Sequence, residues 1–341
     1  MSFRLISSYD SAPRFTAGKQ MPLIETSSYH PPLWLPGGHL QTIFFALLRR
    51  VPQLAVREER LELADGDFLD LSWAGAGRRR LAILSHGLEG SAQDSYIRSM
   101  AVALLDAGWD VLAWNFRGCG PQPNRLLRMY HSGATADLSA VIAHASTRHP
   151  AESLALIGFS LGGNLTLKYL GENPSIVPPA VQGAVVFSTP CDLADSSRVL
   201  ASVANKLYME RFLISMREKI RQKDRLFPGQ LDVRGLERIR TFQEFDDRFT
   251  APINGFRDAA EYWEKNSSRQ YLTAIGVRTL AVNALNDPFL GRLCFPREEA
   301  AASEFFHLET PAHGGHVGFP TGPLAAGSWA DRRAVDFLDG I

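Results

Sequence analysis

The feature that most constrains the fold of this chain is a serine in a glycine-containing motif. The motif lies between a run of strand character and a run of helical character. The motif Gly-Phe-Ser-Leu-Gly at 158–162 places Ser160 after the short apolar run 154–157 and before the helical pattern 163–170. In that context, Gly-x-Ser-x-Gly predicts a tight turn that lifts the serine hydroxyl above the edge of a sheet. Glycines suit the flanking positions because a side chain there would collide with the neighbouring strand and helix.

The rest of the chain alternates strand and helix patterns, which predicts an α/β fold. Apolar runs of strand length occur at 81–85, 111–114, 154–157, 181–187, 279–284 and 305–308, and helical patterns at 96–107, 134–146, 163–170 and 330–338. Such alternation predicts a mostly parallel central sheet with helices on both faces. The alternating runs 56–63 and 68–73 flank Asp65-Gly66, a hairpin signal that adds an antiparallel edge.

The pattern also predicts how the chain is divided. Residues 1–40 are rich in Ser, Pro and Gly and are expected to form an irregular arm, and residues 41–51 are expected to form a short helix. We expect this N-terminal part, residues 1–55, to pack on an α/β domain formed by residues 56–341. Residues 191–270 carry no strong strand pattern, and we expect helices at 197–221, 233–240 and 255–265. An insertion after a strand of such a sheet lies above its carboxyl edge, so this block predicts a helical cap over Ser160.

The net charge and the cysteines indicate which binding partners and which cellular compartment to expect. The formal net charge is zero, which gives no reason to expect a nucleic-acid partner. The three cysteines form no Cys-x-x-Cys pair, which argues against a disulfide framework or a zinc site and favours the cytoplasm. Neither a signal peptide within residues 1–20 nor a membrane span is expected. The apolar burst 43–48 is best explained as a helix packed on its own domain, although contact with a membrane surface stays open.

A serine hydroxyl needs a base within hydrogen-bond reach, and the base needs an orienting acid. On this kind of sheet the chain order is serine, acid, histidine. Asp287 follows the fifth predicted strand and His316 follows the sixth, so both lie in loops at the same edge as Ser160. We therefore predict a triad of Ser160, Asp287 and His316, which requires no cofactor.

Other assignments stay open from the residues alone. Asp192 after the fourth strand is a rival acid, and Asp287 precedes a proline, as turn-forming aspartates often do. His313 is a rival base. A metal held by His313 and His316 is disfavoured because no nearby carboxylate completes the ligand set.

An oxyanion intermediate needs two backbone donors. We predict the N–H groups of Leu161, which follows the serine, and of Leu88, in the glycine-flanked loop after the run 81–85. His86 in the same loop is expected to be structural. In the cap, Phe212 and Met216 belong to an apolar stripe at helical spacing, and we expect them to line the substrate pocket or, in the plainer interpretation, to pack on the domain below.

Several motifs together resemble the YheT-like α/β hydrolases, whose eukaryotic relatives are abhydrolase-domain esterases and lipases. The motifs span nearly the whole chain: PLWLPGGHLQT at 32–42, HGLEGS at 86–91, NFRGC at 115–119, YHSG at 130–133, GFSLGGN at 158–164, EFDD at 244–247, NDPF at 286–289 and GGHVGF at 314–319. The resemblance implies the same triad and the hydrolysis of carboxylic esters with short or medium acyl chains. Asn286 departs from the family, which usually has a second Asp there.

The resemblance leaves the natural substrate open. The first alternative is a lipase or phospholipase-like enzyme at a membrane surface, since the segment 206–240 holds ten Lys and Arg but five Asp and Glu, a local charge of +5. The same triad would also serve acyl transfer to an acceptor other than water. A ligand-binding protein without catalysis is disfavoured by the intact serine, aspartate and histidine.

Overall fold

The computed structural model describes residues 22–48, 51, 53–322 and 327–341. Residues 1–21 of the predicted arm, and with them the prediction that no signal peptide is present, lie outside this part. The described residues form one nine-stranded sheet in the order β1-β9-β8-β7-β6-β4-β5-β3-β2. Its strands are β1 (Leu23–Ile24), β2 (Arg57–Glu62), β3 (Phe68–Ala74), β4 (Arg80–Ser85), β5 (Asp110–Trp114), β6 (Ser153–Phe159), β7 (Val181–Phe187), β8 (Arg278–Val282) and β9 (Phe306–Glu309).

The sheet is parallel from β1 through β5 and antiparallel only where β3 joins β5 and β2 joins β3. The predicted hairpin is therefore the antiparallel edge. The helices are α1 (Gly38–Leu48), α2 (Ser95–Asp106), α3 (Thr135–Arg148), α4 (Leu161–Glu172), α5 (Leu193–Leu200), α6 (Lys206–Leu226), α7 (Phe242–Phe245), α8 (Ala251–Ile253), α9 (Ala259–Asn266), α10 (Arg297–Ala301) and α11 (Trp329–Leu338). The mostly parallel sheet with helices confirms the predicted fold class.

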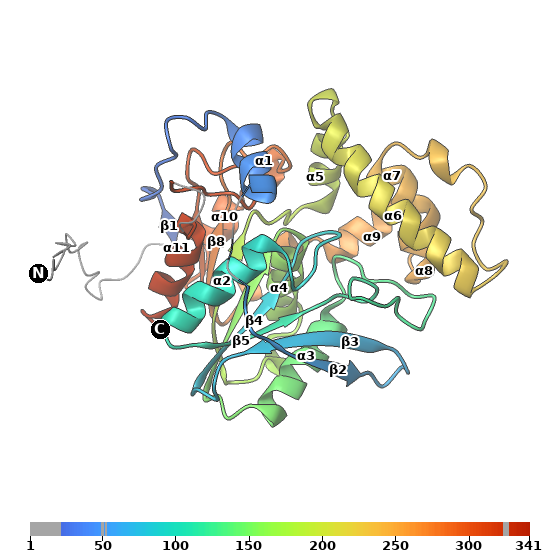
Figure 1. Ribbon diagram of the computed structural model, residues 1–341. Helices are drawn as coiled ribbons and strands as arrows, with labels where there is room; N and C mark the ends of the chain where they lie inside the picture. The colour runs from blue at the N-terminus through green and yellow to red at the C-terminus, as the bar shows by residue number, and fades with distance from the viewer. Residues whose placement is uncertain (1–21, 49–50, 52, 323–326) are drawn as a thin grey trace, which may run out of the picture.

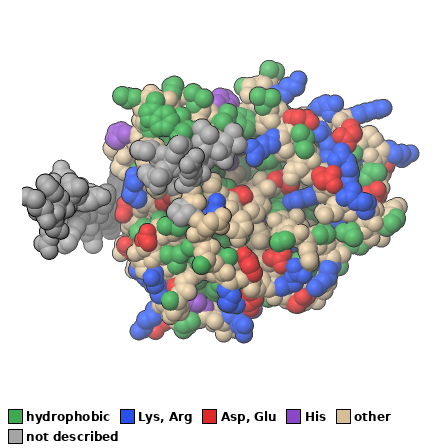
Figure 2. Space-filling view, viewed as in Figure 1, with side chains coloured by type: hydrophobic (Ala, Val, Ile, Leu, Met, Phe, Trp, Pro, Cys, Tyr) green, Lys and Arg blue, Asp and Glu red, His purple; other side chains and the backbone are tan. Residues whose placement is uncertain are grey.

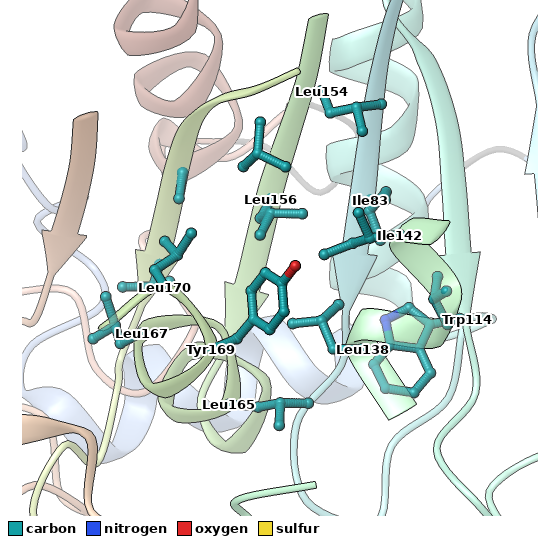
Figure 3. Packing of buried hydrophobic residues seen from close by; sticks show 14 of the residues in the cluster. Ile83, Trp114, Leu138, Ile142, Leu154, Leu156, Leu165, Leu167, Tyr169 and Leu170 are labelled. Carbon is teal, nitrogen blue, oxygen red and sulfur yellow. The ribbon is translucent and has the colours of Figure 1, made fainter. Parts of the chain in front are cut away.

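Two apolar clusters cover the two faces of the sheet, because buried parallel strands present apolar side chains on both sides. On one face the strand residues pack against α3 and α4, as Figure 3 shows for Leu156 beside Leu138 and Tyr169. On the other face they pack against α2 and α11, through residues such as Met100 and Ala334. These layers fix the strand ends, and the strand ends carry the candidate site.

The block between β7 and β8 holds helices and no strand among its described residues, and its helices gather at one end of the molecule (Figure 1). We refer to residues 191–270 as the cap. Its helices form an apolar cluster, which includes Leu213, Phe245 and Phe249 and is joined by Phe289 from outside the cap. The division into an arm, a domain and a cap stays a prediction.

Two of the three predicted cap helices differ markedly from the observed ones, and the third, expected at 255–265, begins later, at Ala259. The expected helix 197–221 is broken between α5 and α6, where the buried Asn205 side chain donates to the carbonyls of Val199 at 3.0 Å and Pro288 at 2.7 Å. The expected helix 233–240 is reduced to a short 3-10 turn over Leu236–Arg238, which follows Gly235 at φ 71°. Outside the cap, the segment expected to be irregular contains β1, which pairs with β9.

Candidate active site

Ser160 lies at the turn between β6 and α4 with φ 52° and ψ −117°, a conformation that side-chain-bearing residues rarely adopt. The turn is held by a hydrogen bond from the Ser160 N–H to the carbonyl of Phe187, at 2.9 Å. A Cβ on Gly158 would lie 2.4 Å from the carbonyl oxygen of Gly162, and one on Gly162 would lie 2.3 Å from that of Ser85. Both glycines are therefore required for the helix to start so close to the strands.

Ser160, His316 and Asp287 are joined by hydrogen bonds. The His316 Nε2 lies 2.9 Å from the Ser160 Oγ, and its Nδ1 lies 2.8 Å and 3.1 Å from the two carboxylate oxygens of Asp287. The Asp287 side chain is fully buried and also accepts the N–H of Phe289 at 2.8 Å. Because the Nδ1–H of a neutral imidazole donates to the carboxylate, the unprotonated Nε2 is left to accept the serine proton.

The rival residues occupy other roles. Asp192 is the N-cap of α5, where its side chain accepts the N–H of Asp195 at 2.9 Å. His313 is exposed, and its Nδ1 lies 3.4 Å from the side-chain nitrogen of Asn286. Within the described residues no hydrogen bond joins either of them to Ser160 or His316, and no group of three or more His, Cys, Asp or Glu gathers that could hold a metal ion.

The loop that carries His316 is braced by α1, which sequence reasoning did not anticipate. The Thr42 Oγ1 accepts the N–H of His316 at 2.8 Å, and the buried Gln41 Oε1 accepts the N–H of Gly314 at 2.9 Å. Asn286 donates to the same Gln41 oxygen at 3.0 Å and accepts the N–H of Gly315 at 3.0 Å. An amide makes both bonds whereas a carboxylate only accepts, so the Asn in place of the family's usual Asp suits this brace. The signal was the motif at 32–42, whose last two residues are Gln41 and Thr42.

The predicted oxyanion loop passes directly beside the serine. Residues 87–90 form a turn closed by the Gly90 N–H on the Gly87 carbonyl at 3.1 Å, and Glu89 has φ 55°. A Cβ on Gly87 would lie 3.4 Å from the Ser160 Cβ. Among the described residues no hydrogen bond uses the N–H of Leu88, and the N–H of Leu161 belongs to the first turn of α4, which has no helical acceptor.

His86 fixes the start of this loop. It is buried, its Nδ1 donates to the Gly87 carbonyl at 2.7 Å, and its Nε2 accepts the N–H of Phe116 at 3.2 Å. Burial lowers the pKa of His86 to about 3, so the ring stays neutral. Its partners are backbone groups, as expected for a structural histidine.

Glu89 connects the predicted oxyanion loop to the cap. Its carboxylate accepts the Tyr130 hydroxyl at 2.5 Å and the hydroxyl of Ser215, and forms an ion pair with Lys219 at 3.0 Å. Ser215 and Lys219 both belong to α6. The positive φ of Glu89 is therefore held by contacts that cross from the α/β domain to the cap.

A cavity of about 120 Å³ opens on Ser160 and His316. Residues of the cap form most of its lining, and Phe212 and Met216 are among them. The described lining residues are Leu88, Glu89, Met129, Tyr130, His131, Ser132, Ser160, Leu161, Pro190, Leu193, Ser196, Ser197, Leu200, Phe212, Met216, Ile220, Phe242, Phe245, Asp246, Phe249, Thr250, Ile253, Tyr262, Trp263, Phe289 and His316.

Known proteins resemble this chain over most of its length. Residues 83–323 match the family model described as the alpha/beta hydrolase fold. The chain is 34% identical over 307 residues to "Putative esterase YheT" of Escherichia coli (strain K12), with 88% of this chain and 89% of that protein covered. It is 28% identical to "Phospholipase ABHD3" of Mus musculus, with 88% and 75% covered, and 26% identical to "Monoacylglycerol lipase ABHD2" of Homo sapiens, with 95% and 82% covered.

Solved structures agree with the fold. The Pyrococcus furiosus esterase Pf2001 superposes with a TM-score of 0.57 at 16% identity, over 86% of this chain and 98% of that one. Because the identity is low, this likeness concerns the fold alone. The family match and the 34% relative carry the assignment. The chain belongs to the alpha/beta hydrolase family, and its predicted resemblance to the YheT-like members is confirmed.

Proposed function

We propose that this protein is a serine hydrolase that cleaves carboxylic esters through an acyl-enzyme. The observation that carries the proposal is the series of hydrogen bonds from Ser160 through His316 to the buried Asp287, in the lining of a cavity. The relatives named as an esterase, a phospholipase and a monoacylglycerol lipase support the same reaction class.

Each residue of the proposed triad then has a defined role in the reaction. His316 Nε2 takes the proton of Ser160 as Oγ attacks the ester carbonyl, and Asp287 stabilises the imidazolium that forms. The N–H groups of Leu88 and Leu161 stabilise the oxyanion of the tetrahedral intermediate. His316 returns the proton to the alcohol oxygen as the carbon–oxygen bond breaks, and water, deprotonated by the same histidine, releases the acid. Acyl transfer would differ only in the acceptor that replaces water.

A second candidate, lipid hydrolysis at a membrane surface, is favoured by exposed apolar side chains. Trp34 and Leu40 near α1, and Val203 and Leu207 at the start of α6, are between 49% and 91% exposed. His39 and Tyr208 stack at 5.7 Å between ring centroids, which brings the starts of α1 and α6 together. Figure 2 shows apolar side chains along this upper edge and basic ones over the cap. No helix among the described residues is long and apolar enough to span a membrane.

Turnover of p-nitrophenyl esters from acetate to palmitate, with and without anionic vesicles, tests both candidates. We expect hydrolysis with a short- to medium-chain optimum that vesicles leave unchanged. A long-chain optimum with activation by vesicles would instead favour the lipase. Absence of turnover across the whole series would contradict ester hydrolysis.

Phe212 and Met216 are proposed to set acyl-chain preference. Their truncation to Ala should enlarge the cavity, so the kcat/KM ratio of octanoate to butyrate esters should rise several-fold. Leu213 on the same helix is fully buried and is absent from the lining, which makes Leu213→Ala the matched control. That control should lower the melting temperature and leave the ratio unchanged, since a large-to-small core change costs about 2–5 kcal/mol. If all three variants lose stability and none changes the ratio, Phe212 and Met216 are core residues.

A further inference from the structure

The cavity contains a carboxyl group that ester hydrolysis does not use. Asp246 begins a π-helical turn, Asp246–Thr250, directly after α7. Such turns often occur at functional sites. Its side chain lines the cavity, and the residue is only 7% exposed. The Oδ2 accepts the indole N–H of Trp263 at 2.9 Å.

No cation balances this carboxyl within the part of the chain that the structure describes. Among the described residues none forms an ion pair with Asp246, and no Lys or Arg lines the cavity. Lys219 is already paired with Glu89. His131, in the same lining, is held neutral by burial, which lowers its pKa to about 3.

The remaining ionisable neighbours do not favour the charged form either. Asp247, next in the chain, adds a like charge, and the buried Tyr262 keeps its proton because burial raises its pKa. Desolvation by burial, more than Asp247, raises the pKa of Asp246 to about 7. An unpaired buried carboxylate is costly, so an empty site holds Asp246 partly protonated near neutral pH.

Aromatic side chains accompany Asp246 in the lining: Phe245, Phe249, Tyr262 and Trp263. Phe245 and Phe249 lie 5.4 Å apart between ring centroids. Faces of aromatic rings attract cations, most strongly where water is excluded. A carboxylate among aromatic rings is the chemistry that recognises an alkylammonium group.

We propose that the Asp246 end of the cavity binds a cationic ammonium group, so that the preferred substrates are esters with such a group in the part that enters the cavity. This proposal rests on ester hydrolysis at Ser160. The plainer interpretation gives Asp246 a structural task alone, to accept the Trp263 N–H and the Thr250 hydroxyl and so stabilise the cap. The two interpretations differ for Asp246→Asn, since an amide oxygen still accepts the Trp263 N–H but carries no charge.

The test compares trimethylammonium esters with their uncharged tert-butyl isosteres, which have nearly the same shape. One pair carries the group on the alcohol (a choline ester) and the other on the end of a p-nitrophenyl acyl chain. At about pH 8 we expect wild-type kcat/KM to favour the cation by about tenfold or more in at least one pair. Asp246→Asn should abolish that preference. Asp247→Asn, at an exposed neighbour, should keep both the preference and the basal activity.

The preference should also depend on pH in a fixed direction. The carboxylate forms as pH rises through about 7, so the ratio of cationic to neutral turnover should rise from about pH 6 to about pH 8. A pH effect on the chemical step itself acts on both members of a pair and cancels in the ratio. Because this measurement uses the wild-type protein, it tests the proposal even if Asp246→Asn fails to fold.

Binding to Ser160→Ala separates this proposal from the reaction itself. Calorimetry with the same trimethylammonium and tert-butyl esters should give the same preference for the cation without turnover. Failure to hydrolyse any ester, with the binding preference intact, would contradict ester hydrolysis and leave the ammonium site supported. Equal turnover and binding of charged and neutral members in both pairs, or a preference that survives in a folded Asp246→Asn, would overturn the ammonium site.

Discussion

Ser160→Ala should lose ester turnover by about 10⁴-fold or more, because the attacking oxygen is removed while the oxyanion donors remain. The fold should survive, since the turn is set by Gly158 and Gly162 and held by the backbone of residue 160. Turnover with p-nitrophenyl butyrate and a melting curve provide the two measurements.

A fluorophosphonate probe supplies an independent measurement of the nucleophile. Wild-type protein should be labelled, and so should the control variant Ser175→Ala, whose serine is exposed on the surface. Ser160→Ala should not be labelled. Labelling of Ser160→Ala at the wild-type level would assign the nucleophile to another residue.

Asp287→Asn should reduce turnover by about 10⁴-fold, as in other triads, because an amide at this position favours the wrong imidazole tautomer. With the nitrogen of that amide facing Nδ1 of His316, the Nε2 atom would carry the proton and could not accept one from Ser160. Steady-state kinetics should place the loss in kcat, with the melting temperature little changed.

Asp192→Asn is the matched control for this charge removal. Asp192 caps α5, and Asn caps helices about as well, so activity should remain close to wild type. A severe loss in Asp192→Asn with a mild one in Asp287→Asn would move the acid to the loop after β7.

Some of this site could be predicted from the sequence because its signals are local. The glycine spacing around Ser160 reflects contacts within a few residues, and the chain order of serine, aspartate and histidine follows from successive strands that end at one edge. The alternation of strand and helix patterns was likewise sufficient for the fold class, which the family match confirms.

The remainder depends on contacts between distant residues. Gln41 and Thr42 meet the His316 loop across 273 and 274 positions of sequence, and no local pattern encodes such a pairing. The break between α5 and α6 depends on Asn205 reaching Pro288, which lies outside the cap. The sequence singled out Asp246 only as part of a family motif, because its lack of a cationic partner among the described residues appears only when the cavity is assembled.

The brace between α1 and the His316 loop also has a consequence for biosynthesis. A ribosome releases Ser160 well before residues 287–316, so a nascent chain holds the proposed nucleophile without its proposed base. Even after those residues emerge, the loop that carries His316 still has to dock on α1, a helix synthesised well before Ser160. If the proposed triad is correct, the serine becomes reactive only after this docking, and a chain truncated before residue 287 is expected to carry an unreactive serine.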